Sequence, residues 1–487
     1  MIRGNILLNT TSNRSLVANA QGIGAFDGWY DDWVVENNVV ATGHYHGISL
    51  LGARNCRVVN NTVVVNPFYT GAAEPWITIT YHKDGSLGTG NVMNNNLYSR
   101  LPDTSFPVVG TSQNNNLVST SYTSHFVDYA GLDFHLKSTS SAVGYGTTSN
   151  APTIDLDGVT RSVPYDAGAY EFVGTPAAPT GLALTVAAYN QINLTWTDNA
   201  SNETGFKVER KKGASGTYAQ IGTAGVNATS YSDSTCGSGT NYYYRVRAYN
   251  ASGDSAYSAE QNATTTEITS GRQGHWKLDA SSGTSATDSS GNGNTGTTSG
   301  GPTWVAGKIG NGLNFDGVDD SVNCGSGATL DNLAAITVTA WIKADTMGEG
   351  GKGRIVVKAS GINPTAGWHL HVSGTNQLEF RVDYTTTELS RVAAVDAIAT
   401  GVWKHVVATW TGSATATNLK LYVDGAEVGY ASTTNGVGTR VDDAASNFYI
   451  GNESGGTRTF DGLLDDVRVY NRVLSAAEIT AVYRAGL

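Results

Sequence analysis

The sequence predicts an all-β protein made of three modules in tandem. Only 15% of the 487 residues are charged and 59 are glycine, as in proteins made of strands and tight turns. A Val-x-Asn-Asn pattern recurs near the N-terminus, whereas apolar and polar residues alternate strictly in the C-terminal part. A Pro/Ala linker begins at residue 175. We therefore expect modules over residues 1–174, 175–267 and 268–487.

The charge and cysteine content argue against several classes of protein. The formal charge is −11, with 30 Lys and Arg against 41 Asp and Glu, so we expect no nucleic-acid partner. No apolar run reaches the roughly 18–20 residues of a membrane span. Cys56, Cys236 and Cys324 fall one in each module and lack the spacing of metal ligands, so we expect them to be buried and unpaired.

The N-terminal module is predicted to be a parallel β-helix. The pattern occurs at residues 35–38, 58–61 and 92–95, with a weaker copy at 113–117, and a β-type run precedes each of the first three. The first copies follow one another after about 23–25 residues, a period typical of strands stacked rung on rung. Asn at a repeated corner can form a ladder of amide hydrogen bonds and tolerates a left-handed backbone. We expect these Asn residues to be structural.

The end of this module resembles the closing segment of bacterial secreted right-handed parallel β-helix proteins. The residues that carry the resemblance lie at 131–144, 155–161 and 166–172. The resemblance implies that His135 and Asp157 are cap residues. Residues 5–9 already have the pattern of a rung, so we expect further rungs upstream of this sequence.

Polar residues flank the predicted strands of this module. Asp27, Arg54 and Lys83 each follow a strand, and His46 precedes one. Because rungs stack about 4.8 Å apart, the first three could share one edge of a groove. We predict these four as catalytic candidates, since elimination beside a uronate needs a base and a cation, and hydrolysis needs two carboxyl groups about 5–10 Å apart. The alternative is that charged residues gather at corners because corners are solvated.

The middle module resembles a fibronectin type III domain. Residues 179–182, 192–196, 203–210 and 242–250 match its strand pattern. The resemblance implies that Trp196 lies in the core and that Tyr242 is the tyrosine corner. It also implies a spacer that holds the flanking modules apart.

The C-terminal module resembles the laminin-G-like domains, which have a concanavalin-type jelly-roll fold. The segment that carries the resemblance best is 461–474, followed by the start of a short helix. Residues 274–279, 308–320, 336–343, 403–410 and 419–425 add to it. Their alternation at period two is typical of half-buried antiparallel strands. The resemblance implies binding of a glycan or an extracellular partner.

Two kinds of site are expected in this module. Trp368 and Tyr384 are less constrained by the strand pattern than the other aromatic residues and could stack on a sugar ring. Relatives often hold a structural Ca²⁺ near the terminal strands, and residues 288–296 are otherwise a plain solvated turn. Four oxygen-bearing side chains are the predicted ligands: Asp279, Asp288, Asn292 and Asp465.

Two functions remain open from the sequence. The first is an extracellular, modular polysaccharide-active protein, in which the β-helix acts on a glycan as a lyase or glycoside hydrolase and the jelly roll binds carbohydrate. The second is a non-enzymatic extracellular adhesin or surface filament component. Convergence of the four catalytic candidates on one face would favour the first. The sequence indicates neither the sugar and its linkage nor the oligomeric state.

Overall fold

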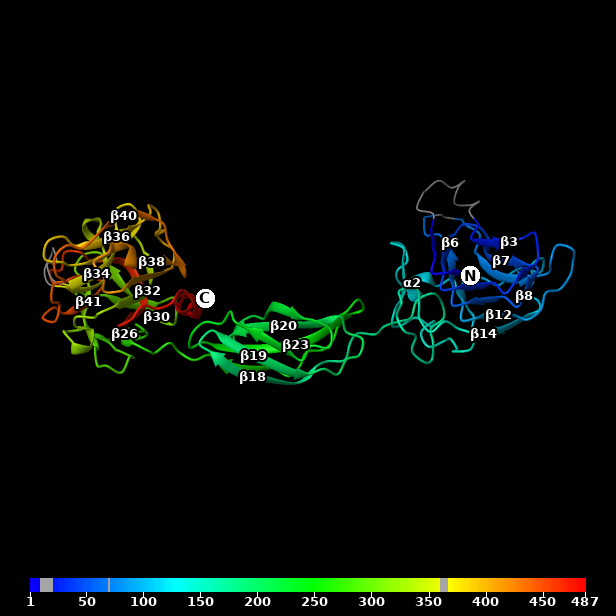
Figure 1. Cartoon of the computed structure of the whole chain (residues 1–487), viewed down its shortest axis with the longest axis horizontal. Helices are drawn as coiled ribbons and strands as arrows, with labels where there is room; N and C mark the ends of the chain where they lie inside the picture. The colour runs from blue at the N-terminus through cyan, green and yellow to red at the C-terminus, as the bar shows by residue number, and fades with distance from the viewer. Residues whose placement is uncertain (9–20, 69–70, 360–366) are drawn as a thin grey trace. The chain divides into compact units, whose positions relative to one another are not determined.

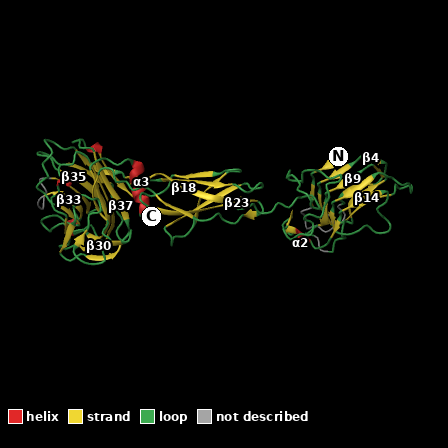
Figure 2. Cartoon of the chain, turned by 90° about the horizontal axis from the view of Figure 1, so that it is seen from below, coloured by secondary structure: helices red, strands yellow, loops and turns green. Residues whose placement is uncertain are grey.

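We describe residues 1–8, 21–68, 71–359 and 367–487 of a computed structural model of the chain (Figure 1). Residue 9, part of the first predicted rung, lies outside them. The chain divides into two compact units, Met1–Thr175 and Pro176–Leu487. Strands dominate both units, as the sequence predicts, and helices are short (Figure 2). None of the described helices is long and apolar enough to cross a membrane.

The N-terminal unit is built from three parallel sheets that the chain visits in turn. The first holds β1 (Ile2–Arg3), β5 (Val34–Glu36), β9 (Arg57–Val59), β12 (Asn91–Asn94) and β14 (Thr111–Asn114). The second holds β2 (Ile6–Leu8), β6 (Val39–Thr42), β10 (Thr62–Val65), β13 (Leu97–Tyr98) and β15 (Leu117–Val118). The third holds β3 (Ile23–Ala25), β7 (His46–Leu51) and β11 (Trp76–Thr80). β4 (Tyr30–Asp31) pairs with β8 (Ala53–Arg54) at a corner.

A ladder of Asn side chains joins successive corners of this unit. The Nδ2 group of Asn38 donates to Oδ1 of Asn61 (2.9 Å), Asn61 donates to Asn96 (3.0 Å), and Asn96 donates to Asn116 (2.9 Å). The residue before each ladder Asn has a left-handed backbone, with φ between 52° and 57°. The sequence prediction of an amide ladder is confirmed.

The structure corrects the alignment of the third repeat by one residue. The sequence pattern set Val92 opposite Val58, but the parallel pairing of β12 with β9 sets Met93 opposite Val58. Asn96, outside the predicted 92–95 copy, is therefore the ladder residue. Three consecutive Asn residues made the register ambiguous in sequence, and the backbone hydrogen bonds of the sheet resolve it.

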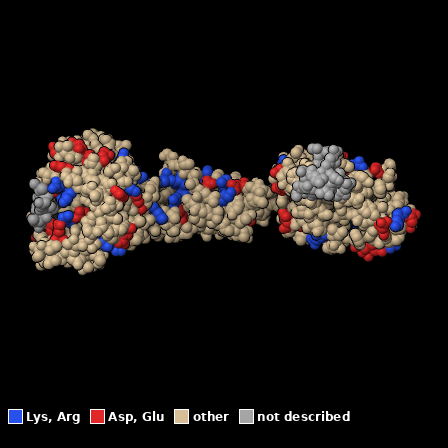
Figure 3. Space-filling view, turned by 90° about the horizontal axis from the view of Figure 1, so that it is seen from above, with Lys and Arg blue, Asp and Glu red and all other residues tan. Residues whose placement is uncertain are grey.

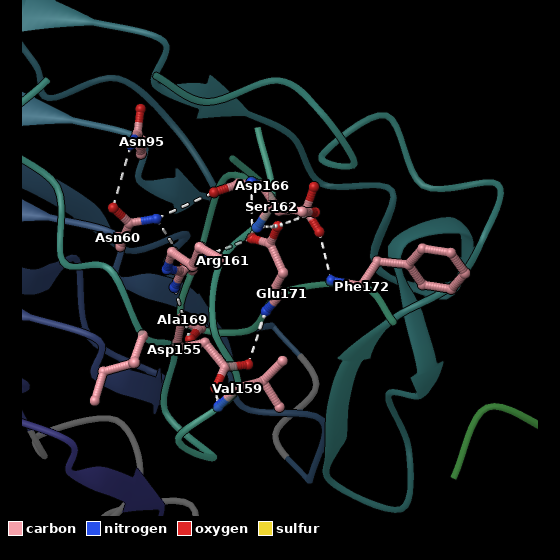
Figure 4. Close-up of polar contacts among 12 residues, drawn as sticks. Asn60, Asn95, Asp155, Val159, Arg161, Ser162, Asp166, Ala169, Glu171 and Phe172 are labelled. Atoms are coloured by element: carbon pink, nitrogen blue, oxygen red, sulfur yellow. Dashed lines mark hydrogen bonds and ion pairs between the residues drawn. The ribbon is translucent and has the colours of Figure 1, made fainter. Parts of the chain in front are cut away.

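A buried ion pair holds the closing segment against the corners (Figure 4). The Arg161 guanidinium lies 3.1 Å from Glu171 and also donates to Asn37 Oδ1 and to backbone carbonyls of the 168–169 turn. The two charged side chains are 0% and 2% exposed. The predicted cap residues His135 and Asp157 pair at 2.7 Å nearer the surface. The segment also contains α2 (Tyr122–His125), β16 (Phe126–Asp128) and β17 (Asp133–Leu136).

The middle module is a sandwich of two antiparallel sheets. One holds β18 (Thr180–Ala188), β19 (Gln191–Thr197) and β22 (Ser230–Asp233). The other holds β21 (Ala219–Ala224), β20 (Gly205–Lys212), β23 (Asn241–Asn250), β24 (Gly253–Asp254) and β25 (Gln261–Thr264). Trp196 lies in the core, and the Tyr242 hydroxyl accepts a hydrogen bond from the Gly237 amide. Basic side chains gather on the surface of this module (Figure 3). Arg245 and Arg247 both form ion pairs with Glu209.

The C-terminal module is a sandwich of two large antiparallel sheets around one apolar core. The first sheet holds β26 (Arg272–Trp276), β29 (Thr303–Ala306), β30 (Asn311–Asp316), β42 (Asp461–Tyr470), β32 (Ile336–Ala344), β37 (Lys404–Trp410), β38 (Leu419–Val423) and β39 (Ala426–Glu427). The second holds β27 (Ser285–Ala286), β28 (Gly296–Ser299), β31 (Ser321–Asn323), β41 (Phe448–Ile450), β33 (Arg354–Ala359), β34 (Gly367–Ser373), β35 (Gln377–Val382), β36 (Leu389–Ala393) and β40 (Tyr430–Thr434).

The helix that ends the chain, α3 (Ala476–Ala485), packs against the middle module (Figure 2). A capping box of Ser475 and Glu478 begins the helix. In the middle of the helix, the Ala481 carbonyl accepts a hydrogen bond from the Ser238 amide at 2.9 Å. A side chain at Gly237 would meet Ala485 within 2.5 Å, so glycine permits this contact. The middle module is therefore more than the spacer that the sequence predicts, because it forms one compact unit with the jelly roll.

Candidate functional sites

Three of the four catalytic candidates lie together on one exposed corner of the N-terminal unit. Lys83 Nζ is 3.0 Å from Asp27 Oδ1, and Arg54 binds Asp31 through two hydrogen bonds of 2.5 and 2.7 Å. Trp29 connects the two pairs: its ring stacks on His82 at 4.9 Å and lies 4.5 Å from the Arg54 guanidinium. The sequence did not single out this tryptophan. Paired charges at a solvated corner agree with the alternative, structural interpretation.

His46, the fourth candidate, lies apart from these residues on the outer face of the β3–β7–β11 sheet. Ile48 and Leu50 point into the core, so Ser49 lies on the opposite face of β7. The pairing with β11 shifts register between His46 and Ile48, and this bulge brings His46 to the same face as Ser49. His46 Nδ1 is hydrogen-bonded to Ser49 Oγ at 2.8 Å. Burial lowers the pKa of His46 to about 4, with the neighbouring His44 as a further cause, so its ring is neutral at pH 7.

Aromatic rings surround His46, and we call this group the His46 cluster. Phe26, Tyr45, Trp76 and Phe106 lie with ring centroids 4.5 to 5.6 Å from that of His46. The Tyr45 side chain is 37% exposed, so the cluster reaches the surface. Arg100 adds a cation 4.6 Å from the Trp76 ring and 3.8 Å from Asp103. The sequence signal for Phe106 and Arg100 was weak, because they come from a loop that only the fold brings to this sheet.

Trp368 lies in the core of the jelly roll, which corrects its prediction as a sugar contact. Its side chain is 0% exposed and its ring lies 5.9 Å from those of Phe380 and Phe448. It stands on β34, where alternate residues point inward. The neighbouring His369 points to the other face of the sheet. A sugar could reach the Trp368 ring only if the sandwich opened.

The outer face of β34 and β35 carries polar side chains that are buried. His369 is 2% exposed, and neither of its ring nitrogens has a hydrogen-bond partner. Burial, followed by Arg354, lowers the pKa of His369 well below its usual value. Tyr384, the second predicted sugar contact, is half-buried at the end of this sheet, where its ring packs over Gly436. Stacking of a sugar on Tyr384 stays a prediction.

The predicted calcium ligands Asp288 and Asn292 share one turn. Asp288 accepts backbone hydrogen bonds from His275, Ser290 and Asn294, and the Asn292 amide donates to backbone carbonyls of β26. These bonds tie the turn to the first strand of the sandwich. The arrangement therefore supports the alternative interpretation, a turn stabilised by its own side chains.

Asp279 and Asp465, the other two predicted ligands, both hold the turn between β29 and β30. Asp465 Oδ2 accepts from the amides of Lys308 (2.8 Å) and Ile309 (2.7 Å), and Asp279 Oδ1 accepts from the amide of Asn311 (3.0 Å). Burial raises the pKa of Asp465 to about 7, despite these amides. Each of the four predicted ligands thus makes hydrogen bonds to the protein's own backbone, and calcium binding by them stays a prediction.

A different acidic group gathers in the loop after β30. One carboxylate oxygen from each of Asp316, Asp319 and Asp320 lies within 4.8 Å of the others. Asp320 is 2% exposed, and burial, together with the two neighbouring carboxylates, raises its pKa. In the sequence these residues belong to the strand pattern of 308–320, which predicts no role for them. Asp316 and Asp319 are exposed, and Asp316 also stabilises the turn by accepting a hydrogen bond from the Val318 amide.

Comparison with known proteins identifies two of the three modules. Residues 177–264 match the fibronectin type III domain, and residues 315–480 match the family described as the concanavalin A-like lectin/glucanases superfamily. An alpha-amylase of Niallia circulans is 40% identical over 94 residues, which cover 18% of this chain and 7% of that enzyme. The chain therefore spans less than a tenth of this relative.

Solved structures match parts of the chain. The binding domain of paraclostridial mosquitocidal protein 1 has a TM-score of 0.36 and 14% identity, covering 44% of this chain and 52% of that one. Domain 4 of AbnA, an extracellular arabinanase of Geobacillus stearothermophilus solved with arabinotriose, has a TM-score of 0.33 and 19% identity, covering 44% and 98%. The all-β chain thus joins a fibronectin type III domain to a concanavalin A-like domain, with parallel sheets in its N-terminal unit.

Proposed function

We propose that this chain is an extracellular, modular carbohydrate-binding protein. In this proposal the concanavalin A-like domain holds the protein on a polysaccharide, and the N-terminal unit, formed by coils of a right-handed parallel β-helix, contacts the same polymer at the His46 cluster. Domains of these types and the short segment similar to an amylase support the proposal. The observation that carries it is the group of surface-reaching aromatic rings around a neutral histidine.

The chemistry of the His46 cluster suits a sugar chain. Aromatic faces pack against the C–H bonds of pyranose rings, and a neutral imidazole can both donate and accept hydrogen bonds to hydroxyls. Tyr45 offers an exposed ring, and His46 is held in place through Ser49. Arg100 supplies a positive charge beside the rings, which would favour an acidic sugar.

The cluster supports elimination better than hydrolysis. Neutral His46 could take the proton from the carbon next to a uronate carboxylate, while the bond from the adjacent carbon to the glycosidic oxygen breaks and a carbon–carbon double bond forms. The leaving oxygen would take a proton from water, His46 would afterwards return its proton to solvent, and Arg100 would neutralise the uronate. Among the described residues, Asp103 is the carboxylate whose charge acts on the pKa of His46. Hydrolysis would require two carboxyl groups at the site.

A binding and product assay on a polysaccharide panel tests the proposal. We expect the full chain to sediment with insoluble or gel-bound polysaccharide, and Tyr45→Ala to weaken this binding. Tyr145→Ala is the matched control, because Tyr145 is similarly exposed at 41% but lies outside the cluster. The ultraviolet absorbance of unsaturated uronate ends reports elimination, and His46→Gln should abolish it. Binding without any new chain ends would favour the non-enzymatic adhesin, and no binding to any polymer would refute the proposal.

A further inference from the structure

One lysine of the jelly roll is fully buried. Lys358, on β33, is 0% exposed, and the residues opposite it on the neighbouring strands are Trp368 and Phe448. Residues directly opposite one another in a sheet share a face, so the lysine side chain leaves the strand on the same side as these two core rings. A lysine is almost never fully buried without a partner.

The partner of Lys358 is the carboxylate of Asp331. Lys358 Nζ donates to Asp331 Oδ1 at 2.7 Å and to the Ser446 carbonyl at 2.7 Å. Asp331 follows the short helix η1 (Ala328–Leu330), 27 residues before the lysine, and its side chain is 20% exposed. A carbonyl oxygen lies about 1.2 Å from its carbon, so Nζ is within about 4 Å of Asp331 Cγ.

The segment that carries Asp331 is held in place by the chain near residue 443. The Asn332 amide donates to Asp443 Oδ1 at 2.7 Å, and the Asn332 side chain donates to Asp442 at 2.7 Å. Asp443 is itself buried and paired with Arg440 at 2.6 Å. Burial raises the pKa of Asp443, and the charges of Lys358 and Asp331 act on that pKa in opposite directions. The amine and the carboxyl group are thus fixed at contact distance, as a reaction between them requires.

A buried ion pair and a covalent bond differ in their electrostatic cost at this position. Two charges removed from water each lose several kcal/mol of hydration, which their attraction restores only in part. Condensation of an ammonium with a carboxylate removes both charges and leaves a neutral amide. A site beside two core rings therefore favours the amide. The partly exposed Asp331 side chain gives the released water a way out.

We propose that Lys358 and Asp331 form an isopeptide bond, an amide between the two side chains. A proton passes from the ammonium to Asp331 Oδ1, and the neutral amine attacks Cγ. The new bond joins Nζ to Cγ while the bond from Cγ to the protonated oxygen breaks, and that oxygen leaves as water with a second proton of the amine. The third proton stays on Nζ and keeps its hydrogen bond to the Ser446 carbonyl.

The bond fastens the connection between the two sheets to β33. Asp331 lies between β31 of one sheet and β32 of the other. A cross-link over 27 residues restricts the unfolded chain, as a disulfide does. The three cysteines of the chain are unpaired and supply no such link. The proposed bond does not depend on carbohydrate binding, so the two proposals fail separately.

Mass spectrometry of the full chain, digested with trypsin after denaturation, tests the proposal. Trypsin does not cut after an acylated lysine. We therefore expect a branched peptide that joins residues 309–343 to residues 355–381, with a mass one water below the sum of the two. Lys358→Arg and Asp331→Ala should each give linear peptides only. Lys404 is the matched internal control: its Nζ also lies 2.7 Å from a carboxylate, that of Asp424, but these side chains are 25% and 29% exposed.

The wild-type peptides decide the outcome even if a variant fails to fold. The branched peptide, together with an unlinked Lys404, supports the proposal. Complete cleavage after Lys358 in a chain that circular dichroism shows to be folded would leave an ion pair alone and overturn it. An intact mass one water low with both peptides linear would place the loss elsewhere and also overturn it. A link at Lys404 as well would show that burial does not select the bond, which contradicts the argument for Lys358.

Discussion

The N-terminal unit and the jelly roll are both built from β-strands, but different interactions stabilise them. At the corners of the first, buried amides form a continuous polar ladder through Asn38, Asn61 and Asn96, and the Arg161–Glu171 ion pair closes the stack. The second holds two large sheets together with an apolar core that includes Trp276, Trp368 and Trp410. In a stack of short parallel strands, the backbone groups at the corners need hydrogen-bond partners. In a sandwich, the apolar inner faces of the two sheets need to be buried against each other.

This difference determines which substitutions each part tolerates. In the ladder each Asn serves two neighbours, so a change at one corner leaves partners unsatisfied on both sides. In the sandwich a truncated side chain leaves a cavity whose walls can partly relax. The following measurements test the contrast, from the largest expected effect to the smallest.

Trp368→Ala should lower the free energy of unfolding of the C-terminal unit by about 3–5 kcal/mol, because it removes a fully buried ring. Denaturant unfolding followed by fluorescence measures the effect. Val402→Ala, at a position of the same unit that is 52% exposed, is the control, and we expect a much smaller loss. Equal effects at the two positions would contradict the assignment of Trp368 to the core.

Asn61→Ala should lower the stability of the N-terminal unit by about 2–4 kcal/mol. The change deprives the Asn38 amide groups, the Asn96 carbonyl oxygen and the backbone carbonyls of Val35 and Val59 of a partner. Hydrogen exchange of the corner amides would report the opening. Asn116→Ala, at the less buried end of the ladder, should cost less. A neutral Asn61→Ala would mean that the ladder is incidental to stability.

Asp465→Asn should change how the stability of the C-terminal unit depends on pH. The folded pKa of Asp465, about 7, lies above the ordinary value of 3.8, so the folded state holds this proton more tightly. Its contribution is complete below pH 4 and is lost as pH rises through 7. As pH rises through this range, the free energy of unfolding of the variant should therefore increase relative to that of the wild type, on the order of 1–3 kcal/mol. Parallel pH profiles of melting temperature would disprove the shift.

Lys83→Ala should change the stability of the N-terminal unit by less than about 1 kcal/mol, because exposed ion pairs contribute little. The Lys83 and Asp27 side chains are 60% and 78% exposed. Thermal melts at low and high salt measure the effect, with Lys137→Ala, at a half-buried lysine that donates to the Thr123 carbonyl, as a comparison on the same unit. A larger loss of polysaccharide binding than of stability would instead give this corner a role in binding.

Much of the fold was predictable because its signals are local. The repeated Asn pairs predicted the ladder, Tyr242 and Trp196 predicted the middle sandwich, and the alternation in 336–343 and 403–410 predicted two central strands of the jelly roll. Asn96 shows the limit of this information. In a run of identical residues, the sequence does not indicate which residue pairs with which position of the neighbouring strand, and only the pairing in the sheet decides it.

The sequence by itself determined the all-β class, the order of the modules and the residue types that turn the chain, since these follow from composition and short-range periodicity. Only the tertiary structure decided which side of β34 Trp368 occupies, that His46 lies apart from Asp27, and that Asp465 holds the turn between β29 and β30. A site joins residues far apart in sequence, and their distances depend on packing between strands and between domains. The spacing of residues along the chain does not predict that packing.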